Sequence, residues 1–229
     1  TNLEEMNEPF VNYIINMATN HDELNNFSTQ IVNGKKVGWE FYTENNIFGG
    51  GSSFAKNYVV ANAWYATHLW QHYRYTLNEE FLAKAFPAMW SCSEYWMSRM
   101  IKAADGTYEC PKEWSPEHGP GSENGVTHAQ QIVWELLANT MAANEVLNVL
   151  TDAQKAQLQD YLSNIDKGLH KEVYTGNWGT SLIPAGSTML REWKYSSYTV
   201  GENGHRHQSH LMCLYPFSQV TPSSPYFEA

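Results

Sequence analysis

The chain has 229 residues, of which 42% are hydrophobic and 17% charged, so it is not an intrinsically disordered protein and is long enough for one large domain or two small ones. Its net charge of −10 argues against nucleic-acid or anionic membrane partners, and no apolar run reaches the ~20 residues that span a bilayer. The three cysteines, Cys92, Cys110 and Cys213, have no metal-site spacing, and we expect buried free thiols.

The first 57 residues predict one helix followed by a long loop. Apolar residues recur at helical spacing over 3–17, and Asn2 can cap that helix. Residues 20–57 are polar and rich in glycine, which favours a loop with short strands around Ile31 and residues 39–41. Loops of this length are usually functional.

Next, the chain predicts helices joined by short links. The pattern over 58–75 indicates one helix, and Asn78 is expected to cap another over 79–86. Pro87 lacks a backbone N–H and fits the first turn of a helix, so it is expected to open a separate helix that runs to about residue 101.

The second half predicts two long helices between two long irregular stretches, followed by a short helix. Residues 105–125 and 174–209 are rich in Gly and other loop-forming residues. Helices are predicted over 127–147 and, with a cap at Thr151-Asp152, over 151–169, and a short one over 210–214.

This order of elements predicts an all-α fold. Helix pairs with alternating short and long connections suggest an α/α toroid with its long loops on one face, although a helical bundle would give a similar pattern. The lack of a fixed 30–50-residue repeat argues against a solenoid.

The loop around Glu117 is the first candidate for chemistry. Glu113 and Glu117 lie beside Trp114 and between prolines that stiffen the backbone. A carboxyl pressed against apolar surface can keep its proton at neutral pH, as a general acid in glycoside cleavage must. The alternative from spacing alone is an ordinary solvated glutamate.

Residues 205–210 form the densest polar cluster. Its histidines could bind a metal, but Arg206 would oppose a cation and no carboxylate completes a familiar metal motif. Arg206 and His207 could instead donate to sugar hydroxyls, or the histidines could bond to backbone carbonyls where a helix starts. Residues 42–46, with Glu44, could bind a polyol or form an Asx turn.

Several segments, in the same order, resemble glycoside hydrolase family 95. They span nearly the whole chain: residues 1–9, Ala63-Trp64, residues 68–73, Ser115-Pro116-Glu117, Glu192-Trp193, residues 205–211 and Leu214-Tyr215-Pro216. The chain departs from the family's usual pattern at Tyr58-Val59-Val60 and around Thr127-His128-Ala129, which bears on the identity of the sugar.

The resemblance implies an (α/α)6 barrel and an inverting exo-glycosidase that releases α-linked L-fucose or L-galactose from oligosaccharides or glycans. It makes Glu117 the general acid and places Arg206, His207 and Glu44 on the sugar, with no cofactor and no metal. It is also consistent with a periplasmic or secreted protein.

The family's water-activating asparagines belong to an H-x-N-x-N pattern and their acidic partner to a D-G-N-F-G-like segment, and neither pattern occurs here. We therefore expect residues 1–229 to be part of a single catalytic domain truncated at both ends. The barrel would be incomplete, the remainder of the parent polypeptide would be its partner, and the chain alone would be inactive.

Two other classes of protein remain open from the sequence. One is a non-catalytic carbohydrate-binding helical domain, which the same aromatic residues, Arg206 and His207 would serve. The other is a different α/α-toroid enzyme, such as a polysaccharide lyase or glucuronyl hydrolase, although the net charge of −10 does not favour uronate substrates.

Overall fold

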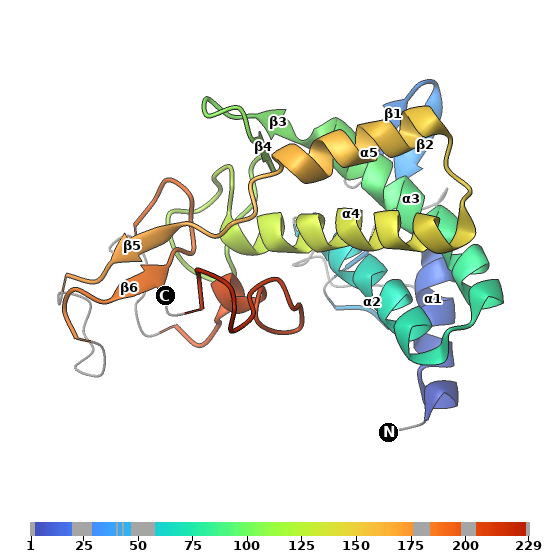
Figure 1. Cartoon of the computed structure of the whole chain (residues 1–229), viewed down its shortest axis with the longest axis horizontal. Helices are drawn as coiled ribbons and strands as arrows, with labels where there is room; N and C mark the ends of the chain where they lie inside the picture. Colours follow the sequence, from blue (N-terminus) through green and yellow to red (C-terminus); the bar gives the residue numbers. More distant parts are fainter. Residues whose placement is uncertain are drawn as a thin grey trace. The chain divides into compact units, whose positions relative to one another are not determined.

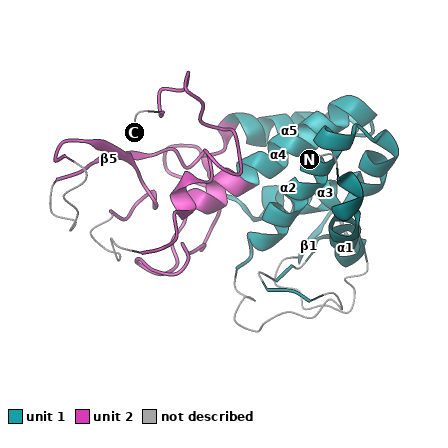
Figure 2. Cartoon of the chain, turned by 90° about the horizontal axis from the view of Figure 1, so that it is seen from below, with its two compact units in different colours: residues 1–100, 133–163 teal, residues 101–132, 164–229 magenta. Residues whose placement is uncertain are grey.

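A computed structural model describes residues 3–19, 29–39, 41–42, 44–46, 58–175, 184–197 and 205–227. The chain divides into two compact units, residues 1–100 with 133–163 and residues 101–132 with 164–229 (Figure 2). We call them unit 1 and unit 2.

Three helices form much of unit 1: α1 (Glu8–Thr19), α2 (Ala61–Thr76) and α3 (Glu79–Arg99) (Figure 1). Each of them packs against the other two. The helix predicted over 3–17 begins only at Glu8, after a 3-10 turn at Glu4–Met6, and the proposed cap Asn2 lies outside the described residues. The helix predicted over 58–75 is confirmed as α2.

One prediction in this unit is wrong: Pro87 does not open a new helix but lies inside α3. The expected cap at the start of α3 is confirmed, because the Asn78 side chain accepts a hydrogen bond from the Phe81 N–H at 3.0 Å. Buried side chains precede and follow the proline, among them Phe86 and Met89. Burial of one continuous apolar face offsets the hydrogen bond that Pro87 cannot make.

A β-hairpin packs on α3. Strands β1 (Thr29–Val32) and β2 (Lys35–Gly38) are antiparallel, and the two-residue turn between them has positive φ at Asn33 and Gly34. An Asn-Gly pair suits this turn because both residues tolerate positive φ. The strand predicted around Ile31 is confirmed, whereas the second strand lies before residues 39–41. Trp39 is fully buried instead and donates its indole N–H to the Ala88 carbonyl at 2.9 Å.

Helices α4 (Thr127–Leu147) and α5 (Asp152–Asn164) follow, and α4 has the predicted bounds. The Thr151 hydroxyl and the Gln154 side chain cap each other's backbone N–H, which confirms the predicted cap of α5. However, α5 ends five residues before the predicted residue 169. Ile165 instead pairs with Tyr108, a contact that local helical spacing cannot reveal.

Unit 2 consists mainly of loops and two small antiparallel sheets. Strands β3 (Ile101–Lys102) and β4 (Tyr108–Glu109) form one sheet, and β5 (Lys171–Val173) and β6 (Thr188–Leu190) form the other. The short helix predicted over 210–214 is a 3-10 turn at Ser209–Leu211.

Two buried glutamines at the start of α4 hold these loops. The Gln130 side chain accepts from the Cys110 N–H at 2.6 Å and donates to the Asp166 carbonyl at 2.5 Å. The Gln131 side chain donates to the His210 carbonyl at 3.0 Å and accepts from the Cys213 N–H at 2.9 Å. These bonds satisfy backbone groups that would otherwise be buried without partners.

The described residues are therefore mostly helical, with three two-stranded sheets, of which only the hairpin around Ile31 had a predicted strand. The three cysteines are free and buried, as predicted. Among the described helices, none is both long and apolar enough to cross a membrane.

Candidate active site

Glu117 lies in the middle of a closed loop in unit 2. Glu113 and Glu123 pair through two backbone hydrogen bonds of 3.0 and 2.9 Å, which brings the two ends of the loop together. Between them the His118 N–H donates to the Ser115 carbonyl at 3.3 Å, so the chain turns sharply around Glu117. The turn leaves the Glu117 carboxyl partly exposed, with 35% of its side-chain surface accessible.

Arg206 and His207 meet this carboxyl. The Arg206 guanidinium makes a short ion pair with Glu117 Oε2, and His207 Nε2 lies 3.3 Å from the same oxygen. Three of the four site residues predicted from the sequence are thus brought together, although Arg206 and His207 lie 89 and 90 positions after Glu117 in the chain. Two cationic or donating groups and one carboxyl, all reachable from solvent, can bind hydroxyl groups.

The electrostatic setting of Glu117 differs from the one expected from the sequence. Partial burial raises the pKa of this carboxyl, but the charge of Arg206 and the hydrogen bond from His207 outweigh it, so the pKa lies below its usual value. The expectation of an apolar pocket that raises the pKa is therefore wrong for the free protein. The reason is Arg206, whose position beside Glu117 depends on a long-range contact.

The histidines of the 205–210 segment have separate partners. The His205 ring stacks on His118 at a centroid distance of 4.5 Å, and its Nδ1 accepts from the His207 N–H at 3.2 Å. Burial lowers the pKa of His210. Within the described part of the chain, no three His, Cys, Asp or Glu side chains are arranged to hold a metal ion.

Behind Glu117, the buried carboxylate of Glu192 joins the two segments of the site. Its side chain is 2% exposed, and its Oε1 accepts a short hydrogen bond from Ser115, a contact of 3.0 Å from His118 Nε2 and one of 3.1 Å from the Ser209 hydroxyl. Ser115 and His118 flank Glu117, while Ser209 follows Arg206 and His207. One oxygen atom therefore contacts both segments.

The next residue, Trp193, supports the loop by packing. Gly119 has a φ of +95°, and a Cβ atom there would lie 2.2 Å from Trp193 Cζ2. The indole and the His118 ring also form a T-shaped pair at a centroid distance of 5.3 Å. Only a glycine at position 119 lets the loop approach Trp193 this closely.

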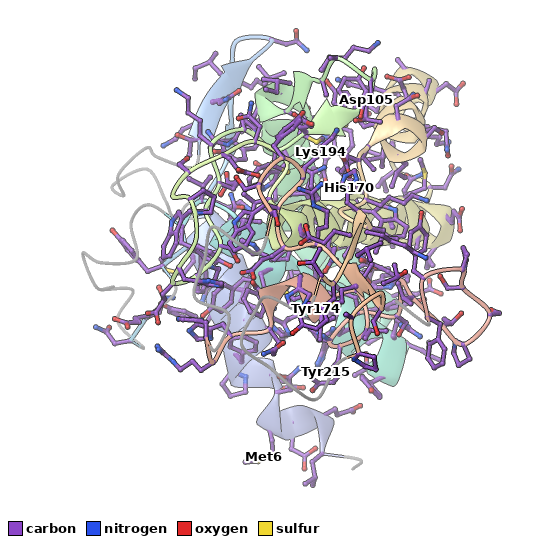
Figure 3. All side chains as sticks on the ribbon, turned by 90° about the vertical axis from the view of Figure 1, so that its left-hand side faces the viewer. Met6, Asp105, His170, Tyr174, Lys194 and Tyr215 are labelled. Atoms are coloured by element: carbon purple, nitrogen blue, oxygen red, sulfur yellow. The ribbon has the colours of Figure 1, made fainter. Side chains whose placement is uncertain are left out.

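Lys194 in turn holds an ionic cluster in which Glu109 and Asp166 are buried. Its Nζ, on a side chain 8% exposed, lies 2.8 Å from Asp105, 2.6 Å from Glu109 and 2.8 Å from Asp166, and His170 contacts Asp166 at 2.8 Å. Asp105, Lys194 and His170 lie near one another in Figure 3.

This cluster shifts the pKa values of its members. Burial raises the pKa of Asp166. The hydrogen bonds from His170 and Lys194 lower it by more, so the pKa lies below its usual value. Burial lowers the pKa of Lys194, and the surrounding carboxylates outweigh that effect and raise it. Asp166 and Lys194 are therefore both charged at neutral pH, and the contacts of Lys194 attach residues 191–197 to β4 and to the turn after α5.

Glu44 belongs to unit 1, not to the unit that contains Glu117. It is exposed and lines a cavity of about 670 Å³ together with Tyr13, Phe41 and Tyr65. Next to it, the Asn45 side chain donates a short hydrogen bond to the Tyr42 carbonyl. This contact is not the predicted Asx turn, in which the side-chain oxygen would accept from a backbone N–H further along the chain. Binding of a polyol by Glu44 stays a prediction.

Sequence reasoning assigned no role to Glu192, Ser115, Ser209 or His118. All four belong to segments that the sequence analysis singled out. What joins them is contact with Glu192, which lies 74 positions after His118 and 77 after Ser115, and a single sequence does not reveal such long-range contacts. Lys194 and its carboxylates were missed for the same reason.

The geometry defines a carboxyl-based site with an arginine and a histidine, and the comparisons give it a family. The sequence model of the glycosyl hydrolase family 95 catalytic domain matches residues 1–229, so the chain belongs to this family. This confirms the resemblance seen in the sequence.

Two relatives match almost the whole chain. A probable alpha-fucosidase A of Aspergillus niger is 28% identical over 94% of the chain, and alpha-L-fucosidase 2 of Arabidopsis thaliana is 27% identical over 96%. A probable alpha-fucosidase A of Aspergillus oryzae is 34% identical over 44% of the chain. The chain spans about a quarter of the length of the first two, 26% and 25%.

Proposed function

We propose that this chain is part of an inverting exo-glycosidase that releases terminal α-linked L-fucose, or L-galactose, from oligosaccharides or glycans. Glu117 is its general acid, and Arg206 and His207 bind the sugar. The observation that carries the proposal is the meeting of these three side chains at one partly exposed carboxyl. Family membership and the names of the relatives support the substrate class.

The proposed acid must carry a proton, and the ion pair with Arg206 opposes this in the free protein. A bound sugar resolves the conflict. Its hydroxyls accept hydrogen bonds from Arg206 and His207 in place of Glu117, and its ring shields Glu117 from water. Both changes raise the pKa of Glu117, since they weaken its ion pair with Arg206 and its hydrogen bond with His207 and increase its desolvation. Arg206 therefore couples sugar binding to protonation of the acid.

Glu117 supplies only half of an inverting reaction. Inversion also needs an activated water on the opposite face of the sugar ring. In the proposed enzyme, residues outside this chain position that water and complete an (α/α)6 barrel, to which residues 1–229 contribute as part of one catalytic domain. Glu44 binds a further sugar hydroxyl, and neither a metal nor a cofactor takes part. The 229-residue chain alone is then inactive.

The test uses the complete polypeptide and two substrates with different leaving groups. The sugar leaving group of 2′-fucosyllactose needs a proton, whereas fluoride leaves α-L-fucosyl fluoride with little help. Glu117→Gln should lower kcat on 2′-fucosyllactose by about 10²–10⁴-fold and change the fluoride reaction far less. Proton NMR should show β-L-fucose as the first product, as inversion requires.

Glu123→Gln is the matched control, because it changes a carboxyl of the same loop that binds Ser196 and not the proposed sugar. Near-normal turnover of 2′-fucosyllactose by Glu117→Gln would rule out the acid role. Binding of 2′-fucosyllactose by the complete protein without any turnover would favour the carbohydrate-binding interpretation, and cleavage of an unsaturated uronide would favour the other toroid enzymes.

A further inference from the structure

We propose that Glu192 is the positioning residue of this site, which holds the Glu117 loop and the Arg206–His207 segment in register through one buried carboxylate oxygen. This inference rests on the proposed function of Glu117. Neither the family match nor the names of the relatives assign Glu192 a role.

The argument starts from the three donors that meet at Glu192 Oε1. Ser115 and His118 lie two residues before and one residue after Glu117, so both sides of the turn are attached to the same atom. The third donor is Ser209, and its hydroxyl also lies 2.7 Å from that of Ser115. The loop that carries the acid and the segment that carries its cationic partners thus share one anchor.

Glu192 is itself fixed to α4. Its carbonyl accepts from the Thr127 N–H at 3.1 Å, and the Thr127 hydroxyl donates to the Arg191 carbonyl at 2.7 Å. Trp193 forms a backbone bridge with Val126, immediately before the helix. The first turn of a long helix is a rigid support, and a side chain attached to it transmits that rigidity to the loops it binds.

Burial separates Glu192 from the reacting atoms. Its side chain is 2% exposed, whereas that of Glu117 is 35% exposed, so the sugar can reach Glu117 and not Glu192. A buried carboxylate is costly unless donors surround it, and Ser115, His118 and Ser209 supply those donors. The same hydrogen bonds that offset the cost of burying Glu192 also fix the loop that carries Glu117.

The test measures kcat of the complete polypeptide on 2′-fucosyllactose and on α-L-fucosyl fluoride. Glu192→Ala releases the loop, and a displacement of about 1 Å can lower turnover about 10²-fold. We expect this loss on 2′-fucosyllactose and a much smaller one on the fluoride, because only the first reaction needs a well-placed proton donor. Glu192→Gln keeps Oε1 as an acceptor and should retain most of the activity.

Two further variants separate positioning from general destabilisation. Ser115→Ala removes one attachment with little change in volume and should show a weaker form of the same substrate dependence, even where Glu192→Ala does not fold. Glu172→Gln is the control: it changes a carboxylate of the same unit that pairs with Arg191 and accepts a hydrogen bond from Ser197. Since Gln keeps an oxygen that can accept from Arg191 and Ser197, this substitution should affect neither reaction.

Equal losses on both substrates in Ser115→Ala and Glu192→Ala, or no loss in either, would overturn the inference. The outcome for Glu117→Gln separates this failure from that of the proposed function. If Glu117→Gln lacks the substrate dependence, the acid assignment itself is wrong. If Glu117→Gln shows it and the variants of Glu192 and Ser115 do not, only the positioning role is wrong.

Discussion

The contact between Gly119 and Trp193 predicts that Gly119→Ala destabilises the protein more than any open-surface glycine change in the same loop. Two costs add at this position. A residue with a side chain is strained at the φ of +95°, at about 1–3 kcal/mol. The new Cβ would also lie 2.2 Å from Trp193 Cζ2, and an overpacked contact of this kind costs about 1–3 kcal/mol.

Gly121 provides a matched control two residues away. Its φ is +89°, but nothing lies within 4 Å of the position that a Cβ would take. Gly121→Ala therefore has the strain of about 1–3 kcal/mol without the clash. The effect of either substitution on the unfolded chain is the same and cancels in the comparison. The difference between the two variants isolates the Trp193 contact at about 1–3 kcal/mol.

Urea denaturation of the complete polypeptide, followed by tryptophan fluorescence, measures the two free energies of unfolding. Activity gives a second measure, since relief of the clash must move either Trp193 or the turn that carries Glu117. We expect Gly119→Ala to lose turnover on 2′-fucosyllactose and Gly121→Ala to keep it. Equal destabilisation by the two substitutions would refute the reasoning, because it would mean that the loop does not pack on Trp193 as described.

Three further predictions concern charge. Arg206→Met removes the charge that lowers the pKa of Glu117, so the alkaline limb of kcat/KM, which reports the free enzyme, should move to higher pH; an unchanged limb would contradict the ion pair. Lys194→Met removes the cationic side chain shared by the buried carboxylates of Glu109 and Asp166, and it should cost about 3–5 kcal/mol in urea denaturation. Lys155→Met, at an exposed pair, should cost at most about 1 kcal/mol. Because the pKa of Asp166 is lowered in the folded state, its contribution to stability is present above about pH 4 and is lost as the pH falls. Asp166→Asn should therefore reduce the dependence of the unfolding free energy on pH at acid pH, measured by urea denaturation. An unchanged dependence would show that Asp166 does not cause it.

Local signals in the sequence predicted those parts of the fold that depend on neighbouring residues. The cap at Asn78, the bounds of α4 and the cap of α5 at Thr151 follow from short-range spacing, and each is confirmed. Pro87 misled the prediction because packing on both sides of it sustains the helix. The end of α5 was misplaced because Ile165 pairs with Tyr108, 57 positions earlier in the chain.

The site shows the same division. Glu117, Arg206 and His207 could be found from their motifs, and the structure brings them together. The pKa direction at Glu117 could not be found, because it depends on a charge 89 residues away. Glu192 was visible as part of a motif, but its role depends on three donors whose proximity only the folded chain reveals.

Each residue of the tripeptide Glu192-Trp193-Lys194 has a different set of partners. Glu192 accepts from hydroxyl groups, Trp193 packs against the turn at Gly119, and Lys194 pairs with a cluster of carboxylates. A change in length here would therefore exchange all three sets of partners at once, which no single compensating substitution could restore. The exposed turn at Gly121-Ser122 has no such restriction. Insertions and deletions among descendants of this sequence should accumulate at that turn and be absent from residues 192–194, and the turn is the natural place to graft a longer loop that reaches for a larger glycan.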